Sequence, residues 1–328
     1  MTSHNDDAVG ASNNGILVIG EALIDIVVTA DNSEPVEHVG GSPANVALAL
    51  GRLGDRVSVL TAIADDDRGR RIADHLRASG VAMHPSSWSL DRTSTALARI
   101  TADGSARYEF DVTWSLPSVP VVRDDIVHVG SIAAFVQPGA DSVLTALQNT
   151  PEPTVISFDP NIRPALVGDR AAALAQVDAI TALADIVKLS DEDAEWLYPG
   201  WGAEAVVDRL LETGARVVAV TMGGDGALIG SAHGKVTVPA PHVKVRDTVG
   251  AGDTFSAGLI DAVLHQPDLL QTPDADALTS LGRHAAAAAA ITVQRPGADP
   301  PTREELDRAL RAEGVRRCTT EGIGLFPY

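Results

Sequence analysis

Residues 184–221, ADIVKLSDEDAEWLYPGWGAEAVVDRLLETGARVVAVT, contain two short apolar runs with helix-period sequence between them. The runs at 184–190 and 216–221 are nearly continuous, which is typical of strands covered on both faces of a parallel sheet. The segment 203–213 has the apolar spacing of a helix and stops before Gly214, a residue type that often follows a helix end. This order predicts a strand, a crossover helix and a parallel strand.

The same alternation extends over most of the chain. Because no long linker interrupts it, we expect one large domain rather than two. The predicted fold class is α/β, with a doubly wound and mostly parallel sheet. Further apolar runs lie at 15–29, 56–63, 125–131 and 154–159, and helices are expected over 67–79, 141–149 and 170–183, from Ala251, and over 274–292 and 302–312.

Two pairs of segments depart from the alternation. Residues 93–102 and 106–113 flank Asp103-Gly104 with alternating apolar and polar residues, which is a hairpin signal rather than a crossover unit. Residues 227–231 and 235–238 form a similar pair. We therefore expect an antiparallel flap and a second hairpin.

Composition excludes several classes of protein. The chain has 328 residues and a formal net charge of -19, which would repel a nucleic-acid backbone. Its single cysteine, Cys318, cannot form an internal disulfide or a thiolate zinc site. The polar residues 1–14 lack the apolar core of an export signal, and no uninterrupted apolar segment is long enough to span a membrane. We expect a cytoplasmic protein without nucleic-acid or membrane partners.

Several common catalytic motifs are missing from the sequence. Gly234-Lys235 is followed by Val236, so there is no P-loop, and Gly20 is followed by Glu21 and Ala22 instead of a dinucleotide-binding glycine turn. There is no serine-hydrolase elbow and no His-Glu-x-x-His motif, and the nine histidines are scattered.

The segment 247–259, DTVGAGDTFSAGL, carries the most chemical information. Gly250, Ala251 and Gly252 precede a helix, and free amides at a helix start bind anions such as a phosphoryl group. Asp253 lies beside them and could accept the proton of an attacking hydroxyl. We expect the helix dipole to lower the pKa of Asp253. The alternative is a helix cap behind a tight glycine turn.

A second glycine turn, Gly40-Gly41, opens the helix 46–52 and is followed by the polar Asn45. Two glycines suit the close approach of a small polyhydroxylated ligand, although an ordinary turn would have the same composition. The first apolar run, 15–29, contains Glu21 and Asp25, and buried carboxylates need partners.

With both glycine motifs in view, the chain resembles the ribokinase-like (PfkB) carbohydrate kinases. The resemblance spans about 15–310 and rests on GGSPANVALALGRLG and DTVGAGDTFSAGL; GEALIDIV, DPNIRP and KLSDEDAEWLYP look most like bacterial fructokinases. It implies a three-layer α/β/α kinase domain over 15–314 with a small β lid formed by 86–118 and part of 24–40. Residues 1–14 and 315–328 would be a leader and a tail.

The resemblance also implies roles for individual residues. Asp253 would be the catalytic base, and the amides of Gly250, Ala251 and Gly252 would form the anion hole with its own. The residues implied to bind the sugar are Asp25, Gly41, Asn45, Asn161 and Arg163, with Tyr108 and Phe110 as lid contacts, although plain hairpin packing fits these two aromatic residues equally well.

The nucleotide and metal sites are implied in the same way. Lys188, Thr221, Gly223, Gly224 and Gly226 would bind ATP. Asp193 would orient a water of the Mg²⁺ shell, but Ser190-Asp191-Glu192-Asp193 replaces the Asn-x-x-Glu of many relatives, and a helix cap at Ser190 is the alternative. Asp247, Val249 and Gly297 would lie at a site for a monovalent cation such as K⁺.

These features predict an ATP- and Mg²⁺-dependent kinase that phosphorylates a primary hydroxyl of a small sugar, with fructose 6-phosphate as the expected product. Arg163 is the main discriminator, because a guanidinium binds hydroxyls or pairs with a carboxylate. The alternatives are a 2-keto-3-deoxygluconate kinase, another sugar or nucleoside kinase, or a non-catalytic sugar-binding protein. Relatives often dimerise through lid strands, so we expect a homodimer.

Overall fold

The computed structural model describes residues 15–29, 32–100, 106–116, 119, 122 and 124–321. Its central sheet has nine strands in the order β15-β14-β13-β12-β11-β10-β1-β4-β6. The pairs from β6 to β13 are parallel, and β13-β14 and β14-β15 are antiparallel, which confirms the predicted fold class. The strands are β1 (Gly15–Ile19), β4 (Arg56–Leu60), β6 (Ala82–Met83), β10 (Ile126–Gly130), β11 (Val155–Asp159), β12 (Ile186–Ser190), β13 (Val217–Thr221), β14 (Ala227–Ser231) and β15 (Gly234–Val238).

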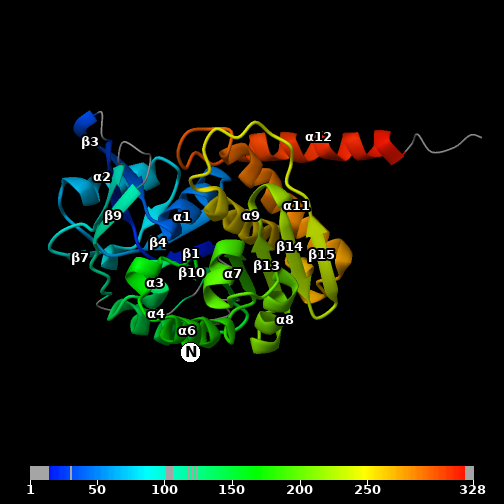
Figure 1. Ribbon diagram of the computed structural model, residues 1–328, viewed down its shortest axis with the longest axis horizontal. Coiled ribbons are helices and arrows are strands. Elements are labelled where there is room, and N and C mark those ends of the chain that lie inside the picture. The colour runs from blue at the N-terminus through cyan, green and yellow to red at the C-terminus, as the bar shows by residue number, and fades with distance from the viewer. Residues whose placement is uncertain are drawn as a thin grey trace, which may run out of the picture.

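Helices cover both faces of this sheet (Figure 1). One face carries α1 (Ser42–Arg52), α9 (Ala251–His265) and α11 (Ala275–Thr292). The other carries α4 (Gly139–Gln148), α6 (Arg170–Thr181), α7 (Asp191–Leu197) and α8 (Ala203–Thr213). The remaining helices are α2 (Asp67–Arg77), α3 (Ile132–Phe135), α5 (Pro164–Val167), α10 (Asp268–Gln271) and α12 (Arg303–Glu321), with short 3-10 turns η1 (Pro85–Ser87) and η2 (Gly223–Asp225).

The two cores follow from the two-residue period of the strands. In β1, Ile16 and Val18 pack with α1, α9 and α11, whereas Leu17 and Ile19 pack with the opposite helix layer. All four side chains are buried. A strand that is buried on both faces needs apolar residues at every position, which is why the sequence runs are continuous.

A smaller sheet, which we call the lid sheet, has the order β3-β2-β8-β9 and contains segments predicted to form the lid. Its strands are β2 (Leu23–Thr29), β3 (Asn32–Gly40), β8 (Thr95–Ile100) and β9 (Ala106–Asp111), and a separate pair joins β5 (Ile63–Ala64) to β7 (Trp88–Leu90). The expected hairpin is the antiparallel pair β8-β9. Its Asp103-Gly104 turn lies outside the described residues.

Three boundaries differ from the sequence predictions. The helix expected over 46–52 begins at Ser42. The run 15–29 is two strands in different sheets, because the chain leaves the central sheet at Gly20 and enters the lid at Leu23. The last helix continues to Glu321 instead of ending near residue 312, and α12 extends beyond the sheet (Figure 1). Residues 1–14 and 322–328 lie outside the described part of the chain. No helix in the described part is both long and apolar enough to cross a bilayer.

Candidate active site

A cleft of about 590 Å³ lies where several parallel strands end. Residues that directly follow β1, β11, β12 and β13 line it, as expected for ligand sites in open α/β sheets. The lid sheet contributes a wall, and the first turn of α9 closes the cleft from the other side. Of the predicted site residues, the cleft gathers Asp25, Gly41, Asn45, Phe110, Asn161, Arg163, Lys188, Asp193, Thr221, Gly223, Val249, Gly250, Gly252 and Asp253.

Asp253 is held in one orientation by α1. Ser42 Oγ donates to Asp253 Oδ1 over 2.6 Å, and Asn45 Nδ2 donates to Asp253 Oδ2 over 2.8 Å. Gly250 is the N-cap of α9, with φ 75°. The hydrogen bonds of the described residues leave the amides of Gly250, Gly252 and Asp253 without a protein acceptor. The Ala251 amide, which was also predicted to face the anion, donates to the Thr248 carbonyl over 3.2 Å instead. An oriented carboxylate therefore lies beside free amides, which is what proton removal next to a phosphoryl group requires.

The expected lowering of the Asp253 pKa was wrong. Burial raises the pKa of Asp253, and the bonds from Ser42 and Asn45 lower it by less. The side chain has lost nearly all contact with water, which destabilises its charged form. This loss of solvation exceeds the stabilisation that the helix start and the two hydrogen-bond donors give to the charged form. The carboxylate is consequently a stronger base than the sequence indicated.

A buried ion pair lies behind the helix start. Lys188 Nζ is 3.0 Å from Asp159 Oδ2, which also accepts a hydrogen bond of 2.9 Å from Ser256 Oγ. Burial lowers the pKa of Lys188, but the carboxylates of Asp159 and Asp193 raise it on balance, so the ammonium stays charged. A Cβ placed on Gly252 would lie 3.0 Å from this ammonium. The cation is thus adjacent to the amides that face the cleft.

The glycine turn at 40–41 has a different reason from the one expected. A Cβ at Gly40 would lie 1.9 Å from the Asp25 carboxylate, and one at Gly41, whose φ is 105°, would lie 2.5 Å from the Glu21 carbonyl. The two glycines therefore admit neighbouring protein groups. Their effect on a ligand is indirect, because they let Asp25 reach the cleft wall.

The lid end of the cleft collects charged groups. Arg163 Nη1 donates to Asn161 Oδ1 over 2.7 Å, and Asn161 adopts a left-handed backbone with φ 38°. Burial raises the pKa of Glu21 to about 7 and also raises the pKa of Asp25, while the Arg163 charge lowers both. Phe110 lies in the cleft wall. The side chain of Tyr108, the other predicted lid contact, lies outside the described residues.

A second cavity of about 340 Å³ adjoins the cleft at Thr221, Gly223, Thr248 and Gly252. Gly224, Gly226 and Ala251 also line it, so the predicted nucleotide residues other than Lys188 meet here. Its far wall is apolar and comes from α9 and α11. A polar cleft joined to an apolar cavity at a helix start can accommodate a phosphate chain between two unlike ligand ends.

Asp193 caps α7 as well as facing the cleft. Ser190 Oγ accepts a hydrogen bond from the Asp193 amide, while Asp193 Oδ2 accepts from the Ser190 amide and Oδ1 from the Ile162 amide. The helix-cap alternative is therefore realised, and each oxygen of Asp193 retains one lone pair. Asp191 and Glu192 are exposed at the same helix start and line the cleft. A site for Mg²⁺ through water fits this set of carboxylates.

Asp247 and Gly297 lie outside both cavities. Asp247 Oδ2 accepts from the Gly297 amide over 2.7 Å, and Oδ1 accepts from the Val249 amide over 3.0 Å. These two bonds lower the pKa of Asp247. The carboxylate thus joins two loops, and backbone carbonyls of the same loops are the oxygen ligands that a monovalent cation would use.

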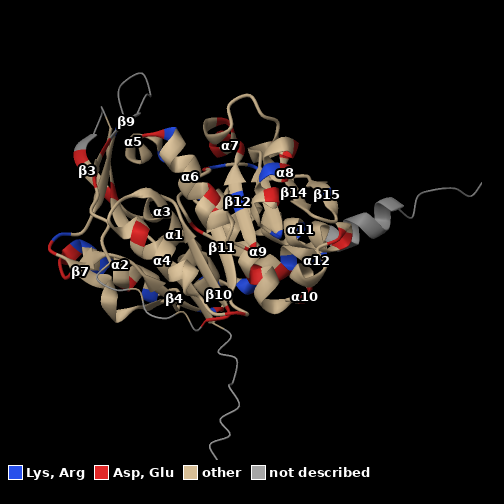
Figure 2. Ribbon diagram, turned by 90° about the horizontal axis from the view of Figure 1, so that it is seen from below, with Lys and Arg blue, Asp and Glu red and all other residues tan. Residues whose placement is uncertain are grey.

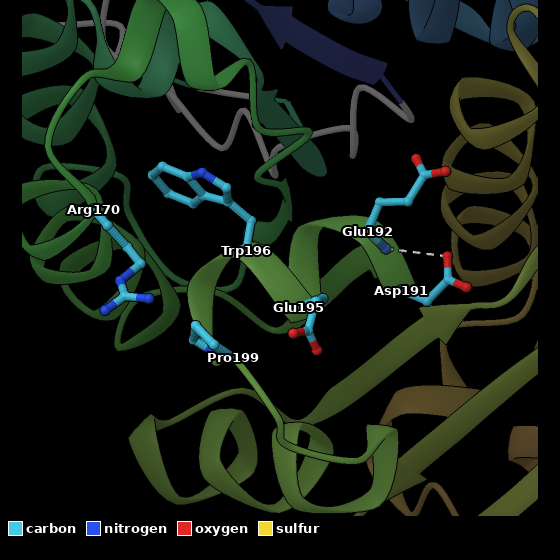
Figure 3. Close-up of a pocket in the computed structure, with 6 residues that line it drawn as sticks. All are labelled: Arg170, Asp191, Glu192, Glu195, Trp196 and Pro199. Atoms are coloured by element: carbon cyan, nitrogen blue, oxygen red, sulfur yellow. Dashed lines mark hydrogen bonds between the residues drawn. The ribbon is translucent and has the colours of Figure 1, made fainter.

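A shallower hollow of about 660 Å³ lies on the other side of α7. Trp196 and Arg170 border it, and the Trp196 ring points away from Asp191 and Glu192 at the helix start (Figure 3). Figure 2 shows the acidic start of α7 in red beside the ends of the central strands. This hollow contains none of the predicted substrate-binding residues.

Sequence reasoning missed several members of the site. Ser42 was passed over although its hydroxyl binds Asp253, and Glu21 was noticed only as a polar intrusion. Glu21 Oε2 accepts from the Ala133 amide over 3.2 Å. Glu21 could have been found from its position directly after β1, but Ser42 has no comparable signal. The others are Leu23, Ala96, Ser131, Ile132, Asp191, Glu192 and Thr248.

Comparisons with known proteins agree with this geometry. The chain is 36% identical over 266 residues to a fructokinase of Rhizobium leguminosarum bv. trifolii, covering 78% of this chain and 81% of the relative. It is 30% identical over 328 residues to probable fructokinase-4 of Arabidopsis thaliana, covering 92% and 99%. Both relatives are therefore similar over most of their length.

Solved structures are similar in the same way. Fructokinase with bound ATP from Xylella fastidiosa superposes with a TM-score of 0.80 at 25% identity, covering 92% of this chain and 99% of that one. Fructokinase from Vibrio cholerae O395 in a fructose-, ADP- and calcium-bound form gives a TM-score of 0.79 at 26% identity, covering 92% and 100%. The model of the pfkB family carbohydrate kinases matches residues 13–305. The chain belongs to the pfkB family of carbohydrate kinases.

Proposed function

We propose that this kinase transfers the γ-phosphoryl group of ATP to a primary hydroxyl of fructose and forms fructose 6-phosphate. The observation that carries the proposal is the Asp253 carboxylate, fixed by Ser42 and Asn45 beside the free amides of α9. The fructokinase names of the relatives and the fructose-bound neighbour support the choice of sugar.

Different residues accept the proton, stabilise the transferring group and hold the sugar. Asp253 accepts the proton of the sugar hydroxyl as its oxygen forms a bond to the γ-phosphorus and the bond from that phosphorus to the bridging oxygen of ADP breaks. The amides of Gly250, Gly252 and Asp253 stabilise the charge of the transferring group, and the buried Lys188 ammonium adds to their field. Asp25, Asn45 and the lid hold the sugar.

Two cations complete the proposal. Asp193, with Asp191 and Glu192 beside it, would hold Mg²⁺ through water, and bound magnesium would neutralise charge on the nucleotide phosphates. Asp247, Val249 and Gly297 would hold K⁺ through backbone oxygens near the helix start. We also propose a homodimer formed through the lid sheet, which light scattering on the purified chain tests.

The charges at the lid end favour a neutral sugar over 2-keto-3-deoxygluconate. Arg163 is already hydrogen-bonded to Asn161, and its charge acts on both Glu21 and Asp25. A substrate carboxylate would therefore face the Asp25 carboxylate and compete with Asn161 for the one guanidinium. Repulsion of this kind selects against the acid even where Arg163 attracts it.

The test is phosphoryl transfer from ATP over a panel of fructose, ribose, 2-keto-3-deoxygluconate and nucleosides. Asp253→Asn should lower turnover by about 10²-fold or more, the usual scale for losing a general base, with fructose binding retained in calorimetry. Asp276→Asn, at an exposed position of α11, is the matched control and should keep full turnover. Near-normal turnover of Asp253→Asn, or no transfer to any sugar, would refute the assignment.

A further inference from the structure

The cavity of about 340 Å³ beside the start of α9 has few groups that could distinguish one purine from another. Its lining includes Ala286, Ala289 and Ala290 of α11, Val293 directly after that helix, and Phe255 of α9. These residues offer surface but no hydrogen bonds. A purine ring stacked or enclosed here would be held by its faces and its size.

The polar side chains of the lining are sparse. Among the described residues that line the cavity, none has a carboxylate, carboxamide, amine or guanidinium group. Thr221 Oγ1 is directed to the Leu189 carbonyl at 3.4 Å. Thr248 lies where the cavity adjoins the sugar cleft. His242 is an exposed side chain of the loop between β15 and α9. A fixed side-chain reader of the base edge is therefore missing from the described lining.

Backbone groups near the cavity are also poorly suited to strict selection. The loop 239–250 forms no helix or strand, and Val245 is 58% exposed. Peptide groups in such a loop offer both donors and acceptors, so the loop can present either to a 6-amino or to a 6-oxo purine. The amides of Arg246 and Asp247 are bonded to the Val293 carbonyl, whereas no hydrogen bond among the described residues fixes the peptide groups of 240–245.

From these observations we propose that the donor site takes purine nucleoside triphosphates as a class, so that GTP and ITP serve as phosphoryl donors besides ATP. The inference rests on the proposed kinase function and extends it to the donor. A pocket that recognises a ligand by apolar contact discriminates by about 10- to 200-fold, whereas one built to hydrogen-bond a particular group rejects analogues by about 10⁴-fold or more. The expected preference for ATP is therefore below about 200-fold.

The experiment measures sugar phosphate rather than ADP, so that all donors are read on one scale. kcat/KM is determined for ATP, GTP and ITP at saturating sugar, and Kd for each nucleotide is measured by calorimetry. GTP and ITP are expected within about 200-fold of ATP in both quantities. A preference for ATP above about 10³-fold would overturn the inference while leaving the kinase function intact. If ATP itself gave no transfer, the proposed function would fail. The Kd ratios would still show whether the cavity discriminates between purine nucleotides.

Two variants separate shape from hydrogen bonding. His242→Ala should change the ratio of kcat/KM for ATP to that for GTP by less than about threefold, and a change above about tenfold would show that this ring reads the base.

Ala289→Leu fills the cavity and should raise KM for ATP and GTP together by about tenfold, with the sugar KM unchanged. Ala312→Leu, at an exposed position of α12, is the control for added volume. Unchanged nucleotide KM values in Ala289→Leu would show that the base binds elsewhere and would refute the inference.

Discussion

Replacing Glu21 by Gln should flatten the pH dependence of stability between pH 5.5 and 8. Burial raises the pKa of Glu21 from 4.5 to about 7, and the side chain is only 4% exposed. Between these two pKa values the folded chain keeps a proton that the unfolded chain has released. Each pH unit in that window then costs about 1.4 kcal/mol of unfolding free energy.

The sign follows from the raised pKa. The contribution of Glu21 is fully present below pH 4.5 and is lost as the pH rises through about 7, which amounts to about 3 kcal/mol in total. From pH 5.5 to 8 the loss is about 2 kcal/mol. Gln does not titrate, and its amide oxygen can still accept the Ala133 amide. The unfolding free energy of Glu21→Gln minus that of the parent chain should therefore rise by about 2 kcal/mol over this range.

Urea unfolding at several pH values measures this difference, and the range stays above the isoelectric point of about 4.7, where precipitation interferes. Subtracting the two profiles removes the contributions of all other titrating groups. Glu212→Gln, at an exposed position of α8, is the matched control and should run parallel to the parent. A difference for Glu21→Gln that stays constant from pH 5.5 to 8 would refute the argument that Glu21 is protonated in the folded chain.

Two further predictions concern other hydrogen-bonded carboxylates. Ser42→Ala removes a donor that lowers the pKa of Asp253, so the acid limb of the kcat/KM pH profile should move to higher pH; an unmoved limb would contradict the role of this bond. Arg303→Met removes the guanidinium whose Nη1 lies 2.9 Å from Asp261 Oδ2 beside Asp55. Stability in urea should fall by about 2 kcal/mol, less than for a fully enclosed pair because Arg303 is 33% exposed. A loss of unfolding free energy below about 0.5 kcal/mol would contradict a stabilising role for Arg303.

The central sheet was predictable because its signal is local. Each interior strand needs an apolar residue at every position, and the runs at 125–131, 154–159, 184–190 and 216–221 all became strands within one or two residues of these bounds. The break in the run 15–29 was visible as Gly20 and Glu21, yet the passage from one sheet to another was not. Sheet membership depends on strand pairing, which the spacing of one segment does not specify.

Properties set by distant neighbours were harder to predict. The helix start predicts a lowered pKa for Asp253, but the observed direction depends on burial under residues more than 200 positions away. The cluster of Asp55, Asp261, His265 and Arg303 had no sequence signal, because its members come from three separate segments. Gly40 and Gly41 were predicted to admit a ligand, but the close neighbours that the structure shows are protein atoms.

A net charge of -19 does not prevent this chain from binding a triphosphate, because the charges close to the site matter more than those on the distant surface. Charges on the molecular surface are screened over about 8 Å at physiological ionic strength, so most of the acidic side chains contribute little at the helix start of α9. Lys188 and Asp253 are buried next to the cleft, where screening is weak. Burial alone would lower the pKa of Lys188, and the ammonium stays charged because the Asp159 carboxylate is equally buried beside it. The local field therefore depends on how this pair of opposite charges is oriented, and Lys188 lines the cleft whereas Asp159 does not. The placement of these few charges, rather than their sum over the chain, determines what the cleft can bind.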